Sequence, residues 1–205
     1  MTKYLVYDVF TSEPFSGNPL AVVPDAHGIA EDDLLRIARE FNFSETTFVL
    51  PPKDAANTAR VRIFTPTREL MFAGHPTIGT AIALAGLGRG DGEMVLELGV
   101  GPIPVTVANG HARFVTRVPL ETAPAASLPA LAMCLSLKPS AIRTDHHAPI
   151  EAGLGTPFTL VELTELADLE AASPNIDGFR AAASDPGRLA VLAYVRQGQA
   201  IEARM

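Results

Sequence analysis

The sequence predicts an α+β fold in which a curled sheet wraps around a central helix. Three observations lead to this prediction: several short strand-like segments, one helical segment that is apolar on every side, and a strand-rich second half that follows a stretch rich in alanine and proline. A helix without a polar face is surrounded by other structure in a soluble protein. We therefore expect the short strands to curl around it.

The strands of the first half are predicted from alternation. Over 4–9, Leu5, Tyr7 and Val9 alternate with Tyr4, Val6 and Asp8. In "ARVRIFTP", Val61 and Ile63 alternate with Arg60 and Arg62. "LAVVP", "TTFVL" and "MVLELGV" are short apolar runs of the kind that form buried strands. The central helix is predicted over 76–87, and the glycines of "GLGRGDG" that follow it indicate a helix end and a turn rather than a dinucleotide-binding loop.

A second, amphipathic helix is predicted over "AEDDLLRIAREF", where one stripe contains Leu34, Ile37, Ala38 and Phe41. Three acidic residues occupy its first turn, where the helix dipole favours negative charge. The periodicity ends at Asn42 and a strand-like run follows. Glu45 is therefore predicted to lie where a helix passes into a strand.

The second half repeats the strand-rich pattern. Leu120 to Ala132 is interpreted as a linker, and "TELADLEAA" as a short helix among further strands. No second all-apolar helical segment occurs in it. The predicted organisation is a complete first half, 1–118, and a partial second half, 119–205, that lacks a central helix.

The composition limits the classes of function. A hydrophobic content of 47% and a charged content of 19% indicate a globular chain. The net charge of −7 argues against binding to nucleic acid or to an anionic membrane, both of which need a basic face. One cysteine, no signal-peptide pattern and no run of about 18 apolar residues predict a cytoplasmic protein without a membrane span.

Two stretches are candidates for chemistry, and each has an ordinary alternative. "GHPTIG" places Pro76 at a position typical of the first helical residue, so the N–H groups of Thr77, Ile78 and Gly79 could bind a carboxylate or phosphate. Water or a loop could equally cap those groups. Glu45 could be a solvated surface acid, but a carboxyl held beside a buried strand could accept and return a proton.

Other signals carry little weight. The adjacent histidines of "TDHH" have neither ligand spacing nor cysteine partners, so they do not indicate a metal site. The sequence lacks a G-x-S-x-G nucleophile elbow. Cys134 lies in the apolar run "LAMCLSL" and is predicted to be a buried packing residue.

Four separated motifs resemble the PhzF-like phenazine biosynthesis proteins. They are "DVFTSEPFSGNPLAVV", "NFSETTFVLP", "RIFTPTRELMFAGHPTIGTA" and "IEARM", in this order along the chain. The resemblance implies the diaminopimelate-epimerase fold, with two pseudo-symmetric halves that each curl a mostly antiparallel sheet around a central helix. It also implies an active site in the cleft between the halves, and a homodimer.

The resemblance implies an isomerase that needs no cofactor or metal and moves a proton on a small carboxylate such as dihydro-hydroxyanthranilate. Glu45 occupies the position of the proton-carrying glutamate in the "SET" motif. We expect the substrate to be bound by residues of the neighbouring motifs, namely Asn18, Ser44, Gly74, His75, Pro76 and Thr77. The resemblance also argues against a racemase with two cysteine thiols, because one of the two cysteine positions of related epimerases falls in the Gly74–His75 stretch.

The sequence departs from the family pattern at its end. Family members continue past "ARMF" into an acidic-Pro-Ala-Thr-Gly-Ser motif that opens the second central helix, whereas this sequence stops at Met205. The departure leaves an alternative to the isomerase: an inactive, truncated half-site module that binds a small anion or a partner chain. In either case we expect the sheet of the second half to lack a covering helix and to expose an apolar face.

Overall fold

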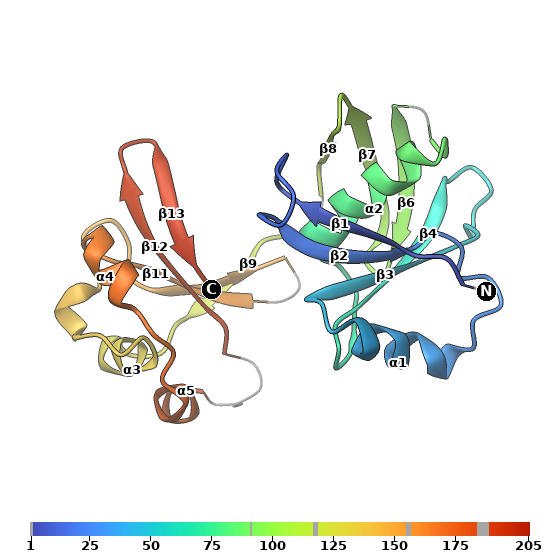
Figure 1. The fold of residues 1–205 in the computed structure, drawn as a ribbon. Coiled ribbons are helices and arrows are strands. Elements are labelled where there is room, and N and C mark those ends of the chain that lie inside the picture. Colours follow the sequence, from blue (N-terminus) through green and yellow to red (C-terminus); the bar gives the residue numbers. More distant parts are fainter. Residues whose placement is uncertain (1, 91, 117–118, 155–156, 184–188) are drawn as a thin grey trace. The chain divides into compact units, whose positions relative to one another are not determined.

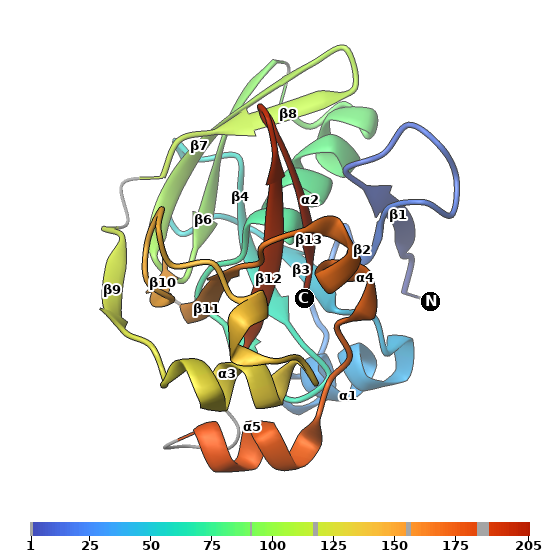
Figure 2. The same cartoon turned by 90° about the vertical axis from the view of Figure 1, so that its left-hand side faces the viewer.

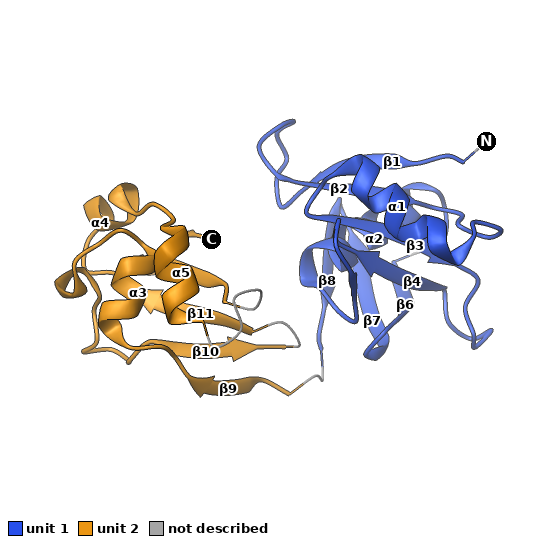
Figure 3. Ribbon diagram, turned by 90° about the horizontal axis from the view of Figure 1, so that it is seen from below, with its two compact units in different colours: residues 1–118 blue, residues 119–205 orange. Residues whose placement is uncertain are grey.

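The computed structural model describes residues 2–90, 92–116, 119–154, 157–183 and 189–205. The chain forms two compact units, residues 1–118 and 119–205, which Figure 3 colours separately. Residues 117–118, where the predicted boundary lies, fall outside the described residues. Each unit is considered by itself below.

Unit 1 contains an eight-stranded mixed sheet in the order β1-β2-β3-β4-β6-β7-β8, with β5 paired to β4. The β2–β3 and β4–β6 pairs are parallel and the other pairs are antiparallel. The strands are β1 Leu5–Val9, β2 Asn18–Val23, β3 Glu45–Leu50, β4 Ala59–Phe64, β5 Glu69–Leu70, β6 Glu93–Leu98, β7 Gly101–Ala108 and β8 His111–Phe114.

The sheet of unit 1 curls around helix α2, Gly74–Gly86. The helix contacts β1, β2 and β3 toward one end of the sheet and β7 and β8 at the other, which a flat sheet would not permit (Figure 1). Seven of its residues are buried, since no face of it carries a charge. The predicted fold class, a curled sheet on a central helix, is therefore confirmed for this unit.

Helix α2 begins at Gly74, two residues before the predicted start. A Cβ atom on Gly79 would lie 2.5 Å from Leu20 Cδ2 and 2.7 Å from Val9 Cγ2, so glycine allows the helix to approach β1 and β2 closely. The helix ends at Gly86, and Gly88 follows with a φ of 71°. The glycine-rich segment is thus a helix end, as predicted.

Helix α1, Glu31–Phe41, contacts β3 and β4. Its buried residues Leu34 and Ala38 join a separate cluster with Phe48 and Phe64, whose rings meet edge to face. Asn42 ends the helix in the left-handed conformation, with a φ of 54°. After this turn the chain enters β3, whose first residue is Glu45. Glu45 therefore lies between a helix end and a strand, as predicted.

Unit 2 contains a five-stranded sheet in the order β13-β12-β11-β10-β9. Only the β11–β12 pair is parallel among these strands. The elements are β9 Glu121–Pro124, α3 Leu128–Cys134, a 3₁₀ turn Pro139–Ala141, β10 Ile150–Gly153, β11 Pro157–Glu162, α4 Leu166–Ala171, α5 Ile176–Ala182, β12 Val191–Gln197 and β13 Ala200–Arg204.

One face of this sheet is covered by helices. Leu131 of α3 and Leu169 of α4 pack with Val161 and Ala193 in one core, and α3 lies beside α5 (Figure 2). Of the alternate side chains on β11 and β12, Leu160 and Leu192 remain partly exposed, whereas Glu162 and Tyr194 are buried. The expectation of a sheet without a covering helix is wrong for the first face, because the short helices supply enough apolar surface to bury it.

The predicted linker is also wrong. Residues 120–132 contain strand β9 and most of helix α3, and Leu131, Ala132 and Cys134 are buried. Proline at the start of α3 is compatible with a helix, and alanine favours one, so this composition fits a helix start as well as it fits a linker. Cys134 is a buried packing residue, as predicted, and burial raises the pKa of its thiol.

Candidate active site

Three elements of unit 1 bring the predicted site residues together. Asn18 is the first residue of β2, Glu45 is the first residue of β3, and His75 lies in the first turn of α2. Because β2 and β3 are parallel, with Leu20 opposite Glu45, the starts of both strands meet at one edge of the sheet. Gly17 makes this edge compact, since a Cβ there would lie 2.6 Å from the Val9 carbonyl oxygen.

Glu45 and His75 form a hydrogen bond in which Glu45 Oε2 and His75 Nδ1 are 2.8 Å apart. The other ring nitrogen, Nε2, lies 3.2 Å from the backbone oxygen of Asn18. The imidazole is 10% exposed and the carboxylate side chain 18% exposed. The pair is therefore mostly enclosed, with the carboxylate retaining a surface that a ligand can reach.

The partners of His75 restrict where its protons lie. A backbone carbonyl oxygen only accepts hydrogen bonds, so Nε2 carries a hydrogen that it donates to Asn18. The Glu45–His75 bond then needs one further proton, held either by Nδ1 or by Glu45 itself. The pair therefore contains one proton that can lie on the carboxylate or on the imidazole. Such a pair is compatible with general acid/base chemistry where the carboxylate is accessible.

Ser44 and Asn18 form a second polar contact at the same edge. The Ser44 hydroxyl donates to Asn18 Oδ1 at 3.3 Å. The side-chain oxygen of Asn18 thus accepts a hydrogen bond from the Ser44 hydroxyl, and its backbone oxygen accepts one from the His75 imidazole. Asn18, Ser44, Glu45 and His75, four of the seven predicted site residues, are linked by these bonds.

The start of α2 alters which backbone groups are available for an anion. In a helix that begins at Gly74 with Ala73 as its N-cap, the free N–H groups are those of Ala73, Gly74 and His75, and Pro76 has none. The predicted donors Thr77, Ile78 and Gly79 lie deeper, where N–H groups bond within the helix, so that prediction is wrong. The earlier helix start thus places the N–H groups without a partner in the helix at Gly74 and His75.

Thr77 and Pro76 are both buried in the first turn of α2. The Thr77 hydroxyl donates to the Ala73 carbonyl oxygen at 2.7 Å, so its hydrogen bond is made within the first turn of the helix. This contact stabilises the helix start that carries His75. Substrate binding by Thr77 and Pro76 stays a prediction, and the geometry favours their neighbours Gly74 and His75 for direct contact.

Phe10 is a neighbour of the site that the sequence pattern did not indicate. Its ring centroid lies 6.1 Å from that of His75, with the two planes tilted by 51°. It directly follows β1, and its φ of 68° aims the side chain in a direction that an extended residue would not take. A positive φ at a phenylalanine has no signature in the sequence.

A second carboxylate–histidine pair occurs in unit 2. The buried Glu162 lies with Oε1 2.8 Å from His146 Nδ1. Tyr194 donates to Glu162 Oε2 at 3.4 Å, and its hydroxyl also contacts His147 Nε2. Burial and the charge of Glu162 raise the pKa of Tyr194. Among the described residues, no three His, Cys, Asp or Glu side chains are arranged to hold a metal ion.

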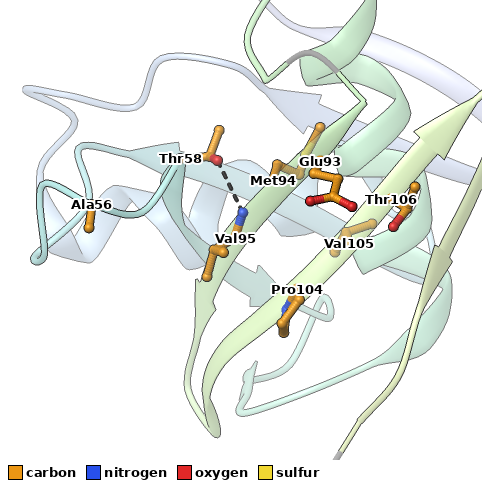
Figure 4. A pocket seen from close by; sticks show the side chains of 8 residues that line it. All are labelled: Ala56, Thr58, Glu93, Met94, Val95, Pro104, Val105 and Thr106. Atoms are coloured by element: carbon orange, nitrogen blue, oxygen red, sulfur yellow. Dashed lines mark hydrogen bonds between the residues drawn. The ribbon is translucent and has the colours of Figure 1, made fainter.

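A surface pocket of about 250 Å³ lies elsewhere in unit 1, over β6 and β7 (Figure 4). Its lining includes Glu93 and Thr58, whose hydroxyl accepts the N–H of Val95 at 3.1 Å. It contains neither Glu45 nor His75. The candidate active site is therefore the cluster at the start of α2 rather than this pocket.

The family of the chain is shown by its match to the PhzC-PhzF model, described as phenazine biosynthesis-like protein, over residues 7–205. The chain belongs to this family. The resemblance read from the four motifs is confirmed. Among the described residues of this family member, no helix is long and apolar enough to cross a membrane.

Two relatives carry names that bear on activity. An uncharacterized isomerase from Mesorhizobium japonicum is 43% identical over 177 residues, which cover 83% of this chain and 58% of the relative. The trans-2,3-dihydro-3-hydroxyanthranilate isomerase of Pseudomonas aeruginosa is 39% identical over 210 residues, covering 100% of this chain and 71% of that enzyme. The chain thus spans less than two thirds of the first relative and somewhat more of the second.

Solved structures agree on the fold. A PhzF-family phenazine biosynthesis protein from Bacillus anthracis superposes with a TM-score of 0.83 at 26% identity, over 98% of this chain and 70% of that one. A hydroxyproline epimerase from Agrobacterium vitis superposes with a TM-score of 0.57 at 19% identity, over 98% and 68% of the two chains. The epimerase likeness concerns the fold alone, which places this chain among epimerase-like α+β folds.

Proposed function

We propose that this chain acts as an isomerase or epimerase of the PhzF-like family, moving a proton on a small carboxylate substrate with Glu45 as general acid/base. The observation that carries the proposal is a carboxylate that is both hydrogen-bonded to His75, at 2.8 Å, and still accessible, with the Glu45 side chain 18% exposed. The names of the isomerase relatives support the reaction class.

In the proposed reaction the Glu45 carboxylate removes a proton from a carbon of the substrate. The electron pair of the broken C–H bond moves into the conjugated system that ends at the substrate carboxylate. Glu45 then returns the proton, to another carbon in an isomerisation or to the opposite face of the same carbon in an epimerisation. Atoms and charge balance without an oxidant or a cofactor: between the two steps Glu45 is a neutral acid and the negative charge lies on the substrate. The hydrogen bond from His75 orients the Glu45 carboxylate before the first step and after the second.

The free N–H groups at the start of α2 are suited to hold the substrate carboxylate. Those of Gly74 and His75 lie at the positive end of the helix dipole, where anions bind well. The Asn18 amide nitrogen has no hydrogen bond within the described part of the chain, so it can donate to a substrate oxygen. This assignment gives Gly74, His75 and Asn18 direct roles, with Ser44 orienting the Asn18 amide.

The substrate is proposed by class. The Pseudomonas aeruginosa relative is named for a dihydro-hydroxyanthranilate. A small carboxylate of that kind suits a site in which free N–H groups bind the carboxylate and Glu45 lies beside it as a general base. We further propose that the protein forms a homodimer in the cytoplasm, which light scattering of the purified chain would check for the assembly.

The decisive experiment compares Glu45→Gln with Glu162→Gln. Each replaces a carboxylate paired to histidine at 2.8 Å by a nearly isosteric amide, so the second variant controls for the chemical change itself. The rate of deuterium wash-in to candidate carboxylates should fall about 10²- to 10⁴-fold in Glu45→Gln and change little in Glu162→Gln. Undiminished exchange in Glu45→Gln would show that another group carries the proton.

The alternative function is an anion- or partner-binding module without turnover. The partly exposed apolar side chains on one face of the unit 2 sheet, Leu160 and Leu192 among them, favour a surface that another chain covers. Titration of the 205-residue chain with a carboxylate separates the two functions. Binding without exchange supports the module, and exchange by the purified chain eliminates it.

A further inference from the structure

The loop that joins β1 to β2 is held rigid by its own hydrogen bonds. It begins after Val9, which pairs with Asn18, and so forms the closed end of a hairpin. The hydroxyl of Thr11 lies 2.9 Å from that of Ser16 and accepts the N–H of Glu13 at 3.0 Å. The Asp8 carboxylate accepts the N–H of Phe15 at 2.9 Å. The loop is therefore an ordered part of unit 1 rather than a loose connection.

Two phenylalanines in this loop combine two unfavourable features. Phe10 and Phe15 have φ values of 68° and 67°, in the left-handed region that bulky residues rarely occupy. Their side chains are also 72% and 97% exposed to solvent. A strained backbone that presents apolar rings to water is a feature that folding alone does not favour, and such strain clusters at ligand-contacting segments.

Phe10 differs from Phe15 in its neighbours. The ring of Phe10 lies beside His75, at a centroid distance within the 4.5–7 Å range of aromatic pairs. Within the described part of the chain, no ring contact involves Phe15. Because His75 is 10% exposed and Phe10 is 72% exposed, the free aromatic surface at this edge belongs to Phe10.

We propose that Phe10 contacts the substrate and makes the site selective for carboxylates on a flat, unsaturated ring. The proposal rests on the proposed function, since it places the substrate carboxylate at the N–H groups of Gly74 and His75. Because the ring centroids of Phe10 and His75 are 6.1 Å apart, the exposed face of Phe10 is available to a ligand bound beside His75. A flat ring gains dispersion and quadrupole interactions from that face that a short acyclic chain cannot match.

Selectivity follows because the N–H groups and Glu45 contact one part of the substrate and Phe10 contacts another. The N–H groups and Glu45 interact with the carboxylate and with the carbon that loses its proton, which ring and chain substrates share. Phe10 interacts only with what extends from them. Removing its ring should weaken the binding of cyclic carboxylates and leave acyclic carboxylates unaffected.

The test measures dissociation constants of benzoate and propanoate for the wild-type chain and for Phe10→Ala, by calorimetry. Phe10→Ala should raise the dissociation constant of benzoate about tenfold and leave that of propanoate unchanged. Phe15→Ala is the matched control, since it removes the same side chain from the same backbone conformation in the same loop, and it should change neither constant. Phe10→Leu, which preserves bulk without a π face, should give an intermediate value and also guards against misfolding in Phe10→Ala.

The outcomes separate this inference from the proposed function. Equal benzoate binding by wild type and Phe10→Ala overturns the role of Phe10 even where Glu45→Gln abolishes exchange. Selective loss of benzoate binding upholds it even where Glu45→Gln exchanges normally, because benzoate has no proton to move. Absence of benzoate binding to the wild-type chain, or an equal loss in Phe15→Ala, also overturns it.

Discussion

Both units of the molecule contain a glutamate hydrogen-bonded to a histidine Nδ1 at 2.8 Å, yet the two pairs are enclosed in opposite ways. In unit 1 the Glu45 side chain is 18% exposed and that of His75 is 10% exposed. In unit 2 the Glu162 side chain is 2% exposed and that of His146 is 42% exposed. The carboxylate is the more accessible partner in the first pair and the inaccessible one in the second.

The difference separates a group that can react from one that holds structure. A general base must touch the proton that it removes, and Glu162 has almost no surface with which to do so. Glu162 instead satisfies a tyrosine hydroxyl and an imidazole within the fold. A short carboxylate–imidazole contact is therefore insufficient evidence of catalysis, and the accessible partner decides its role.

The largest expected effect tests this comparison through the histidines. His75→Ala removes the group that shares the proton of Glu45, so the rate of deuterium exchange should fall about 10- to 100-fold. His146→Ala should leave the exchange rate within about twofold, because Glu162 is enclosed. Equal losses of rate in the two variants would break the distinction between a reactive and a structural pair. Circular dichroism of both variants controls for folding.

A second comparison concerns a glycine on one helix of each unit. A Cβ on Gly178 of α5 would lie 2.7–2.8 Å from backbone atoms of Met133 and Cys134, which cannot move aside. A Cβ on Gly79 of α2 would meet side-chain methyl groups of Leu20 and Val9, and these groups can shift. Gly178→Ala should therefore lower the free energy of unfolding by about 2–4 kcal/mol, and Gly79→Ala by about 1 kcal/mol, after the better helix propensity of alanine is included.

Chemical denaturation measures both values, and Gly86→Ala is the control. The nearest atom to a Cβ there is the Tyr7 hydroxyl oxygen at 3.7 Å, an ordinary contact. That variant should be as stable as the wild type or slightly more stable. A Gly79→Ala variant less stable than Gly178→Ala would contradict the reasoning from backbone rigidity.

The smallest expected effect is on thermal stability: substitution of an arginine in unit 1 should have a pH-dependent effect, and substitution of one in unit 2 should not. Arg62 pairs with Glu31 and Glu69, whereas Arg204 donates to the carbonyl oxygens of Leu169, Glu170 and Ala172 at the end of α4. The hydrogen bond from Arg62 lowers the pKa of Glu31 below 4.5. A lowered pKa in the folded state stabilises the protein above pH 4.5, and that stabilisation is lost as the pH falls through the folded-state value.

Thermal melts at pH 7 and pH 3 check this prediction. The difference in Tm between wild type and Arg62→Ala should be modest at pH 7, because Glu31 is exposed, and should shrink at pH 3. The difference caused by Arg204→Ala should be the same at both pH values, since carbonyl groups do not titrate in this range. A pH-dependent effect of Arg204→Ala would show that its partners in solution are carboxylates.

The sequence predicted those parts of the molecule that depend on local pattern. The stripe of α1, its end at Asn42 and the burial of α2 follow from periodicity and from the absence of charge, and the motifs were sufficient for the family. The interpretation of 120–132 as a linker failed because alanine and proline are as compatible with a helix start as with an extended segment.

Other features depend on contacts between distant residues, which no local pattern records. Glu162 and Tyr194 are separated by 32 residues and meet because β11 and β12 pair in parallel. The approach of Phe10 to His75 requires a backbone conformation that phenylalanine rarely adopts. Helix α2 begins two residues before its predicted start, and this difference changes which backbone N–H groups are free to bind an anion.

The parallel pairing of β2 and β3 also determines where the chain tolerates changes of length. Successive residues of a strand point to opposite faces, so one inserted residue between Asn42 and Glu45 would turn the carboxylate away from His75. The loop at 51–58, which joins β3 to β4 beyond the site, carries no such restriction. Insertions and deletions in functional variants should therefore accumulate in that loop and be absent from the three-residue step that precedes Glu45.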